Sequence, residues 1–138
     1  MRRILVIIGI VIFVYACSTQ KGAVQVNKNE PDIAVPDSLE YDLETFDVKF
    51  ETWYQMHNNP SMYRSQQYYE NWNRQYVSAW NHKAIHSSKR GFFEPIVGYD
   101  PNEDYGFELN HELFYYFQYV ENVLKIKILQ GGPKAVNF

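Results

Sequence analysis

Cysteine is almost absent from this chain of 138 residues, because Cys17 is the only one. The residues that follow it can form no disulfide with one another, so their stability must come from a packed core. Basic residues are also few, with 13 lysines and arginines against 16 aspartates and glutamates. A mildly acidic chain carries no basic footprint for nucleic acid, which argues against nucleic acid as a partner.

The sequence also lacks an apolar run long enough to span a bilayer. The longest run extends from Ile4 to Tyr15, and a helix of that length covers only about 18 Å of a hydrocarbon core about 30 Å thick. Arg2 and Arg3 precede the run, and Ala16 separates it from Cys17. A positive start, a short apolar run and a small residue before a cysteine are typical of a cleavable export signal, and the stretch resembles a lipobox.

We therefore expect residues 1–16 to be a signal peptide and Cys17 to become the lipid-bearing first residue of the mature protein. Cleavage removes Arg2 and Arg3 and changes the formal net charge from −3 to −5. Two or more acyl chains anchor a protein stably, so membrane attachment through lipid on Cys17 is the expected localisation. Ser18, which is not acidic, follows the cysteine. The lipobox resemblance then implies the outer membrane of a Gram-negative bacterium.

The remaining sequence divides into three regions. Residues 18–36 are polar, contain two prolines and show neither helical nor strand periodicity, so residues 17–37 are predicted to form a flexible tether. Residues 38–130 are predicted to form one small domain, and residues 131–138, which begin Gly-Gly-Pro, a flexible C-terminal tail.

Apolar periodicity predicts an α+β fold for the domain. Two long amphipathic helices and one short helix would pack with one to three strands. The expected elements are a strand near residues 39–44, a short helix near 50–57, a long helix from 61–65 to about 87, an edge strand or strap near 92–97 and a second long helix over 109–124. Phe114, Tyr115 and Tyr119 lie off the main stripe of the last helix, so either the strands cover them or they leave an apolar patch.

Several polar patterns are candidates for a site. Asp100, Asn102 and Asp104 alternate as in a calcium loop, but glycine stands seventh instead of sixth, at Gly106, so a turn that begins the last helix is favoured. Asn73 falls inside an aromatic helical stripe, where a buried amide needs partners. A bond that fixes the packing to a loop or strand backbone is favoured there over ligand contact. No metal site is predicted.

Residues 73–81 (NRQYVSAWN) and 99–110 (YDPNEDYGFELN) resemble a family of small bacterial lipoproteins known as a domain of unknown function. The similarity extends from about Leu39 to Val120. It implies no activity, ligand or catalytic residue, but it makes the polar residues of both stretches the first candidates for binding. These candidates are Asn73, Arg74, Trp80, Asn81, Tyr99, Asp100, Asp104, Tyr105 and Asn110.

The sequence shows no serine in a glycine elbow and no free cysteine after lipidation, so we expect neither an enzyme nor a cofactor. Two functions remain. The first is a non-catalytic envelope module that binds another protein through exposed aromatic residues. The alternative is a peptidoglycan- or carbohydrate-binding lipoprotein, in which tyrosine and tryptophan stack on sugar rings beside Asn and Asp groups.

Overall fold

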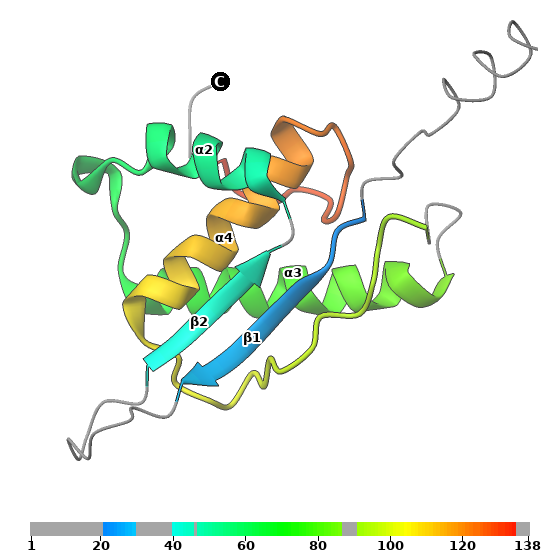
Figure 1. The fold of residues 1–138 in the computed structure, drawn as a ribbon, viewed down its shortest axis with the longest axis horizontal. Coiled ribbons are helices and arrows are strands. Elements are labelled where there is room, and N and C mark those ends of the chain that lie inside the picture. The colour runs from blue at the N-terminus through cyan, green and yellow to red at the C-terminus, as the bar shows by residue number, and fades with distance from the viewer. Residues whose placement is uncertain (1–20, 30–39, 46, 87–90, 135–138) are drawn as a thin grey trace, which may run out of the picture.

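The computed structural model describes residues 21–29, 40–45, 47–86 and 91–134. In these ranges the chain forms three α-helices, one short 3-10 helix and a two-stranded antiparallel sheet (Figure 1), which confirms the predicted α+β fold. The elements are β1 (Val24–Asn29), β2 (Glu40–Thr45), α2 (Val48–His57), η2 (Pro60–Met62), α3 (Gln66–His86) and α4 (Gly106–Asn122).

The sheet presents one face to the core. Val24 is paired with Thr45, and Val26 with Leu43. Because alternate side chains of a strand point to the same face, both valines and Leu43 are buried together. The predicted strap after α3 is confirmed beside β1, where the Val26 N–H donates to the Val97 carbonyl oxygen at 3.0 Å.

The prediction of a tether over residues 17–37 is wrong for residues 24–29, which form β1. Only Val24 and Val26 of this strand point into the core, and two apolar residues are too few for a recognisable period. The strand depends on β2, which follows it in the chain, and on the strap. The folded domain extends at least to Gly22, whose N–H donates to the Phe92 carbonyl at 2.8 Å.

The two outer helices begin and end close to the predicted positions. Asp47 caps α2, because its carboxylate accepts a hydrogen bond from the Lys49 N–H at 3.0 Å. The helix ends before Asn58, as the sequence indicates. Helix α3 begins at Gln66 and ends at His86, ahead of Gly91 and Pro95, which prevent its continuation.

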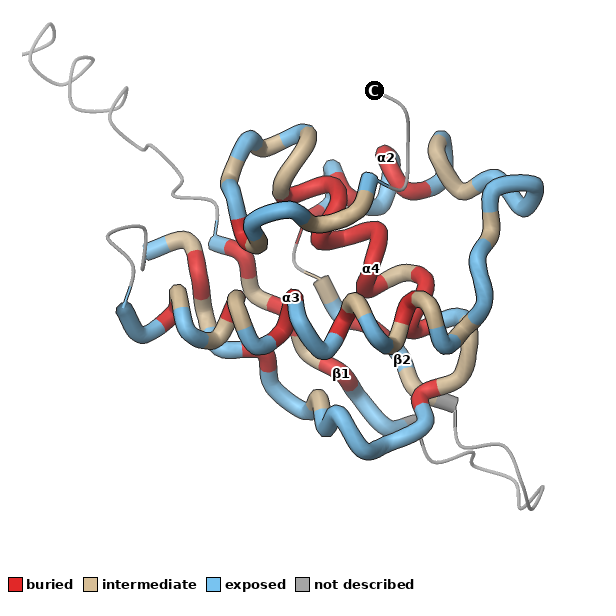
Figure 2. Tube along the Cα trace, turned by 180° about the vertical axis from the view of Figure 1, so that it is seen from behind, coloured by how far each residue is buried: buried red, intermediate tan, exposed pale blue. Residues whose placement is uncertain are grey.

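Helix α4 forms the centre of the molecule. Its trace is buried along most of its length, whereas α3 alternates between buried and exposed positions (Figure 2). Phe114 contacts Tyr69 of α3, and Tyr119 contacts Phe50 and Trp53 of α2. The off-stripe aromatic residues are therefore covered, and helices α2 and α3 contribute the ring contacts. None of the aromatic side chains in the described ranges is exposed.

The predicted signal peptide and Cys17 lie outside the described residues. Among the residues that the structure describes, no helix has the length and apolar character needed to cross a membrane. Residues 131–134, which were expected to belong to the C-terminal tail, are described, and Gly132 lies against the hydroxyl of Tyr76 on α3.

Candidate functional site

Asn73 and Asn110, two of the predicted site residues, meet in the core between α3 and α4. The Asn73 amide nitrogen donates to the backbone oxygen of Asn110 at 2.8 Å and to its side-chain oxygen at 3.2 Å. The Asn110 amide donates to the Gly106 carbonyl at 2.8 Å. The partner of Asn73 is thus a helix backbone, not the expected loop or strand, and the pair fixes the packing of the two helices.

Trp80 and Asn81 hold the strap. The Trp80 indole N–H donates to the Glu94 carbonyl at 2.7 Å, and the Asn81 side-chain oxygen accepts from the Ile96 N–H at 2.9 Å. Both polar groups are used inside the fold. Arg74 lies apart from them, on an exposed part of α3 that borders an open groove with His82 and Leu129.

The predicted turn at residues 99–106 is confirmed. The Asp100 carboxylate accepts from the Asn102 N–H at 2.8 Å, and the Asp104 carboxylate accepts from the Gly106 N–H at 3.0 Å. The Tyr105 hydroxyl accepts from the Asp100 N–H and donates to the Gly98 carbonyl, while its ring stacks on Tyr99. These bonds are typical of a turn and a helix start.

Asp100 and Tyr105 also border a shallow cavity of about 350 Å³ next to β1 and β2. Its other acidic group, Glu103, accepts a hydrogen bond from the Tyr41 hydroxyl at 2.6 Å. The polar groups at this place are therefore largely occupied by one another. In the described part of the chain, no three His, Cys, Asp or Glu side chains are grouped so that they could hold a metal ion.

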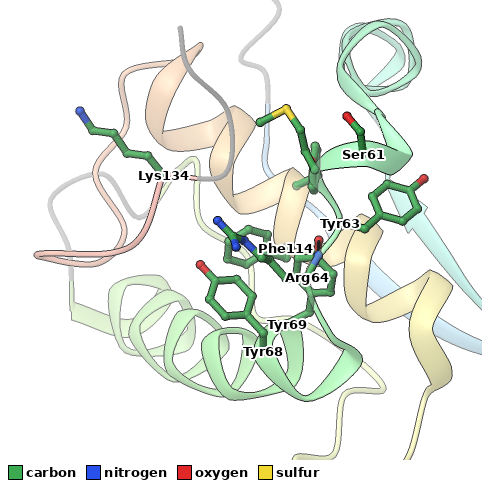
Figure 3. A pocket seen from close by; sticks show the side chains of 9 residues that line it. Ser61, Tyr63, Arg64, Tyr68, Tyr69, Phe114 and Lys134 are labelled. Atoms are coloured by element: carbon green, nitrogen blue, oxygen red, sulfur yellow. Dashed lines mark hydrogen bonds between the residues drawn. The ribbon is translucent and has the colours of Figure 1, made fainter.

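A recessed cavity of about 230 Å³ lies elsewhere, where η2 and the start of α3 meet α4 (Figure 3). We call it the Arg64 cavity. Tyrosine rings and hydroxyls form much of its wall, and the charged residues among the described part of the lining are two cations. Its lining residues are Ser61, Met62, Tyr63, Arg64, Tyr68, Tyr69, Phe114, Tyr115 and Lys134.

The backbone holds Arg64 in position while its side chain stays exposed. The Arg64 N–H donates to the Tyr69 hydroxyl at 2.9 Å, and the preceding Tyr63 N–H donates to the Pro60 carbonyl at 3.2 Å. The Tyr63 hydroxyl donates to the side-chain oxygen of Asn58. Burial raises the pKa of Tyr115 to about 12 and also raises that of Tyr69. Both hydroxyls therefore remain protonated donors at neutral pH.

His111 is fully buried behind the wall of this cavity. Its ring lies 4.4 Å from the ring of Tyr115, 4.5 Å from Tyr63 and 5.0 Å from Tyr69, all measured between centroids. Burial lowers the pKa of His111 to about 4, so the ring is neutral. The Tyr54 hydroxyl lies 2.8 Å from Nδ1.

The tautomer of the His111 ring sets which of the Tyr54 hydroxyl and Nδ1 donates this hydrogen bond. Burial also raises the pKa of Tyr54, which keeps that hydroxyl protonated. The Nε2 atom has no hydrogen-bond partner among the described residues. A buried ring nitrogen without a partner among the described residues thus lies directly behind three tyrosines of the cavity.

None of the predicted binding residues lines the Arg64 cavity. The sequence indicates Tyr69 only as part of the long helix, which is predicted to start near Ser61 or Ser65. A usable signal was present, because Tyr63, Tyr68 and Tyr69 flank Arg64 and the nearest acidic residue after it is Glu70. Lys134 comes from the far end of the chain and gave no local signal.

A protein-family model described as a family of unknown function (DUF6146) matches residues 5–133. The match extends beyond the residues 39–120 in which the resemblance was seen, and it confirms the prediction of a family of unknown function. No curated protein and no solved structure matched the chain.

Proposed function

This chain belongs to the DUF6146 family, and we propose that it is a non-catalytic, membrane-tethered lipoprotein of the bacterial envelope that binds a saccharide in the Arg64 cavity. The observation that carries the proposal is the lining of that cavity, in which tyrosine rings, hydroxyl groups and an exposed arginine are combined. Aromatic faces and hydrogen-bonding groups together are what the recognition of a sugar ring requires.

The distribution of aromatic residues favours a saccharide over a protein partner. A protein partner that docks on exposed aromatic residues needs such residues on the surface, and the described ranges contain none. The exposed large apolar residues, such as Val48, Ile85 and Val97, belong to different elements. The cavity volume of about 230 Å³ is below the 300–1,000 Å³ that is usual for drug-sized ligands. It therefore suits one sugar ring of a longer chain.

The chemistry of the cavity supports binding without catalysis. Ser61 is its only serine, and the Ser61 hydroxyl donates to the Asn59 side-chain oxygen at 2.9 Å. Among the residues that the structure describes, the lining contains neither a histidine nor a carboxylate that could activate this hydroxyl as a nucleophile.

The tether is proposed from the sequence at residues 1–17. Arg2, Arg3, the short apolar run and Ala16 support cleavage before Cys17 and its lipidation. A direct test replaces Cys17 by alanine. The unchanged protein should fractionate with membranes and incorporate labelled fatty acid, whereas Cys17→Ala should do neither. Fatty acid incorporation that survives the substitution would contradict lipidation at this residue.

Saturation-transfer NMR with full-length protein in detergent tests the binding function. A mixture of neutral and acidic monosaccharides and short oligosaccharides should receive magnetisation from the protein. Tyr68→Ala should reduce the transfer, because this residue lines the cavity. Trp72→Ala is the matched control, since Trp72 is also a half-buried aromatic residue of α3 but lies outside the cavity lining. No transfer to any sugar, or equal loss in both variants, would contradict the proposal.

A further inference from the structure

We infer that the ligand of the Arg64 cavity is an acidic saccharide, whose ring carboxylate is bound by Arg64 with Lys134 at the rim. This inference rests on the proposed saccharide-binding function and adds the charge of the ligand. It is argued from the charge balance of the cavity, the partners of the two cations and the shape of the wall.

The charge of the cavity is opposite to that of the chain. The protein has a formal net charge of −3, yet the described residues that line the cavity include Arg64 and Lys134 and no aspartate or glutamate. A recess with two cations and no acid attracts an anion, because low-dielectric walls strengthen the local potential.

Neither cation is neutralised by the protein in the described ranges. The ion pairs found there join Lys21 to Glu94 and Lys127 to Glu121. Arg64 uses its backbone N–H for Tyr69 and leaves the guanidinium exposed. An arginine fork binds a planar carboxylate through two parallel hydrogen bonds, which makes Arg64 the principal anion-binding group.

The two cations come from distant parts of the sequence. Arg64 lies in the short connection between η2 and α3, whereas Lys134 comes from the C-terminal segment, and its side chain extends outward from the rim in Figure 3. A lysine side chain is a flexible chain of four carbons and reorients easily. Lys134 thus adds long-range electrostatic attraction for the carboxylate, and Arg64 determines the geometry in which the carboxylate binds.

The remaining wall fits the ring of the ligand. Tyr68, which is half-buried, supplies aromatic surface, and its ring packs edge-to-face on the buried Phe114 with the centroids 5.8 Å apart. The hydroxyls of Tyr68 and of the exposed Ser61, whose oxygen can still accept a hydrogen bond, supply polar groups for the hydroxyls of the sugar. A free phosphate would use the cations and leave this aromatic surface without a partner, which favours a sugar carboxylate over inorganic phosphate.

The decisive comparison uses D-glucuronic acid and D-glucuronamide as probes, because they share a ring and differ at the carboxylate. Titration of the full-length protein in detergent should show glucuronic acid binding at least about tenfold more tightly. This factor corresponds to the lower end of the strength of a hydrogen bond to a charged group. The preference should fall as salt is raised, since the cations are exposed.

Arg64→Gln should remove most of this preference, and Arg64→Lys should restore only part of it, because lysine keeps the charge without the fork. Lys134→Gln should have a smaller effect. Arg74→Gln is the matched control, since Arg74 is an exposed arginine outside the cavity and its loss should leave the preference intact. Circular dichroism should show the same helical content in all variants.

Three outcomes would overturn the inference, and they are distinguishable. Equal binding of the acid and the amide would leave the saccharide function standing and refute the anionic ligand. If inorganic phosphate or a peptide carboxylate bound as tightly as glucuronic acid, the claim that the bound anion belongs to a saccharide would be refuted. Binding of neither sugar probe, nor of any saccharide in the NMR mixture, would refute the proposed function itself.

Discussion

Asn73 and Asn110 show how single polar residues define the core of this molecule. Asn73 is wholly buried, and its amide nitrogen serves both oxygens of Asn110. Its own side-chain oxygen has no partner in the described structure. An imperfectly paired amide costs free energy, and it persists here because it locks one register between α3 and α4.

Asn73→Ala should lower the free energy of unfolding by about 2 kcal/mol, because the backbone and side-chain oxygens of Asn110 lose their buried donor. Asn110→Ala should be at least as damaging, since it also loses the bond to Gly106. Urea denaturation of both variants and of the double variant checks this. The free energy of unfolding lost in the double variant should be smaller than the sum of the losses in the two single variants. Strict additivity would show that the two amides act independently.

Two neighbouring residues of α4 give opposing pH dependences. Burial lowers the pKa of His111 to about 4 from 6.5, so the unfolded state binds more protons between these values and stability rises with pH across that window. Burial, reinforced by Glu51, Asp42 and Glu108, raises the pKa of Glu112 to about 7 from 4.5. The folded state then binds more protons, so stability falls as pH rises from 4.5 to 7.

Glu112→Gln should abolish the decrease in stability that Glu112 causes as the pH rises. At pH 8 the variant should be more stable than the unchanged protein by about 1 kcal/mol, after allowance for solvent screening of the carboxylate, and the two should converge near pH 4. Melting temperatures between pH 4 and 8 provide the measurement. Glu44→Gln, an exposed residue of β2, makes the same charge change and should alter the profile little. Parallel profiles for the unchanged protein and Glu112→Gln would contradict the assignment.

Gly98 is required by both its conformation and its neighbour. Its φ of 81° is disfavoured for other residues, and a Cβ atom there would overlap the Val26 carbonyl oxygen of β1. Gly98→Ala should therefore destabilise the fold by about 2 kcal/mol or more. Gly91→Ala is the control, because a Cβ at Gly91 meets nothing within 4 Å. Thermal denaturation that finds equal losses in both variants would refute this account.

Among the elements, helix α2 depends on its cap. Asp47→Ala should reduce the free energy of unfolding by about 1 kcal/mol, because the Lys49 N–H loses its acceptor. Asp47→Asn should restore most of the stability, since an amide oxygen also accepts this bond. Urea midpoints measure the difference. If asparagine were as damaging as alanine, the charge of Asp47 would matter more than its capping bond.

The three helices and β2 were predictable because each carries a local signal. The recurrence of Tyr69, Trp72, Tyr76 and Trp80 indicates α3, and the alternation from Leu39 to Leu43 indicates β2. Strand β1 was missed because its stability comes from non-local pairing rather than from a pattern of its own. Helix α4 appeared amphipathic, but it is covered by α2, α3 and β2 together, and such a degree of burial depends on contacts distant in sequence.

At the scale of the whole molecule, the position of β1 shortens the segment between Cys17 and the folded domain compared with the predicted tether. Five peptide units separate Cys17 from Gly22, the first residue bonded to the strap. A fully extended chain of that length reaches about 18 Å. A lipid on Cys17 would therefore hold the domain close to the membrane surface, rather than at the end of a tether of about twenty residues.

Local patterns indicate only part of the candidate site, namely the tyrosines that flank Arg64. The polar residues singled out in the sequence are used mainly in turns and helix contacts, as Asp100 and Asn73 illustrate. The Arg64 cavity assembles η2, α3, α4 and Lys134, and only folding brings these parts together. Its functional signal is the absence of an acidic partner for Arg64, which becomes visible once the neighbours of that residue are known.

Chemical-shift mapping by NMR tests the central claim most directly, because it locates the bound saccharide. Addition of D-glucuronic acid to isotope-labelled full-length protein in detergent should shift the amide signals of Arg64, Tyr68 and Tyr115 and leave those of residues 100–104 unchanged. Shifts confined to residues 100–104, or no saturable shift at Arg64 and its neighbours, would contradict the assignment of the Arg64 cavity as the binding site.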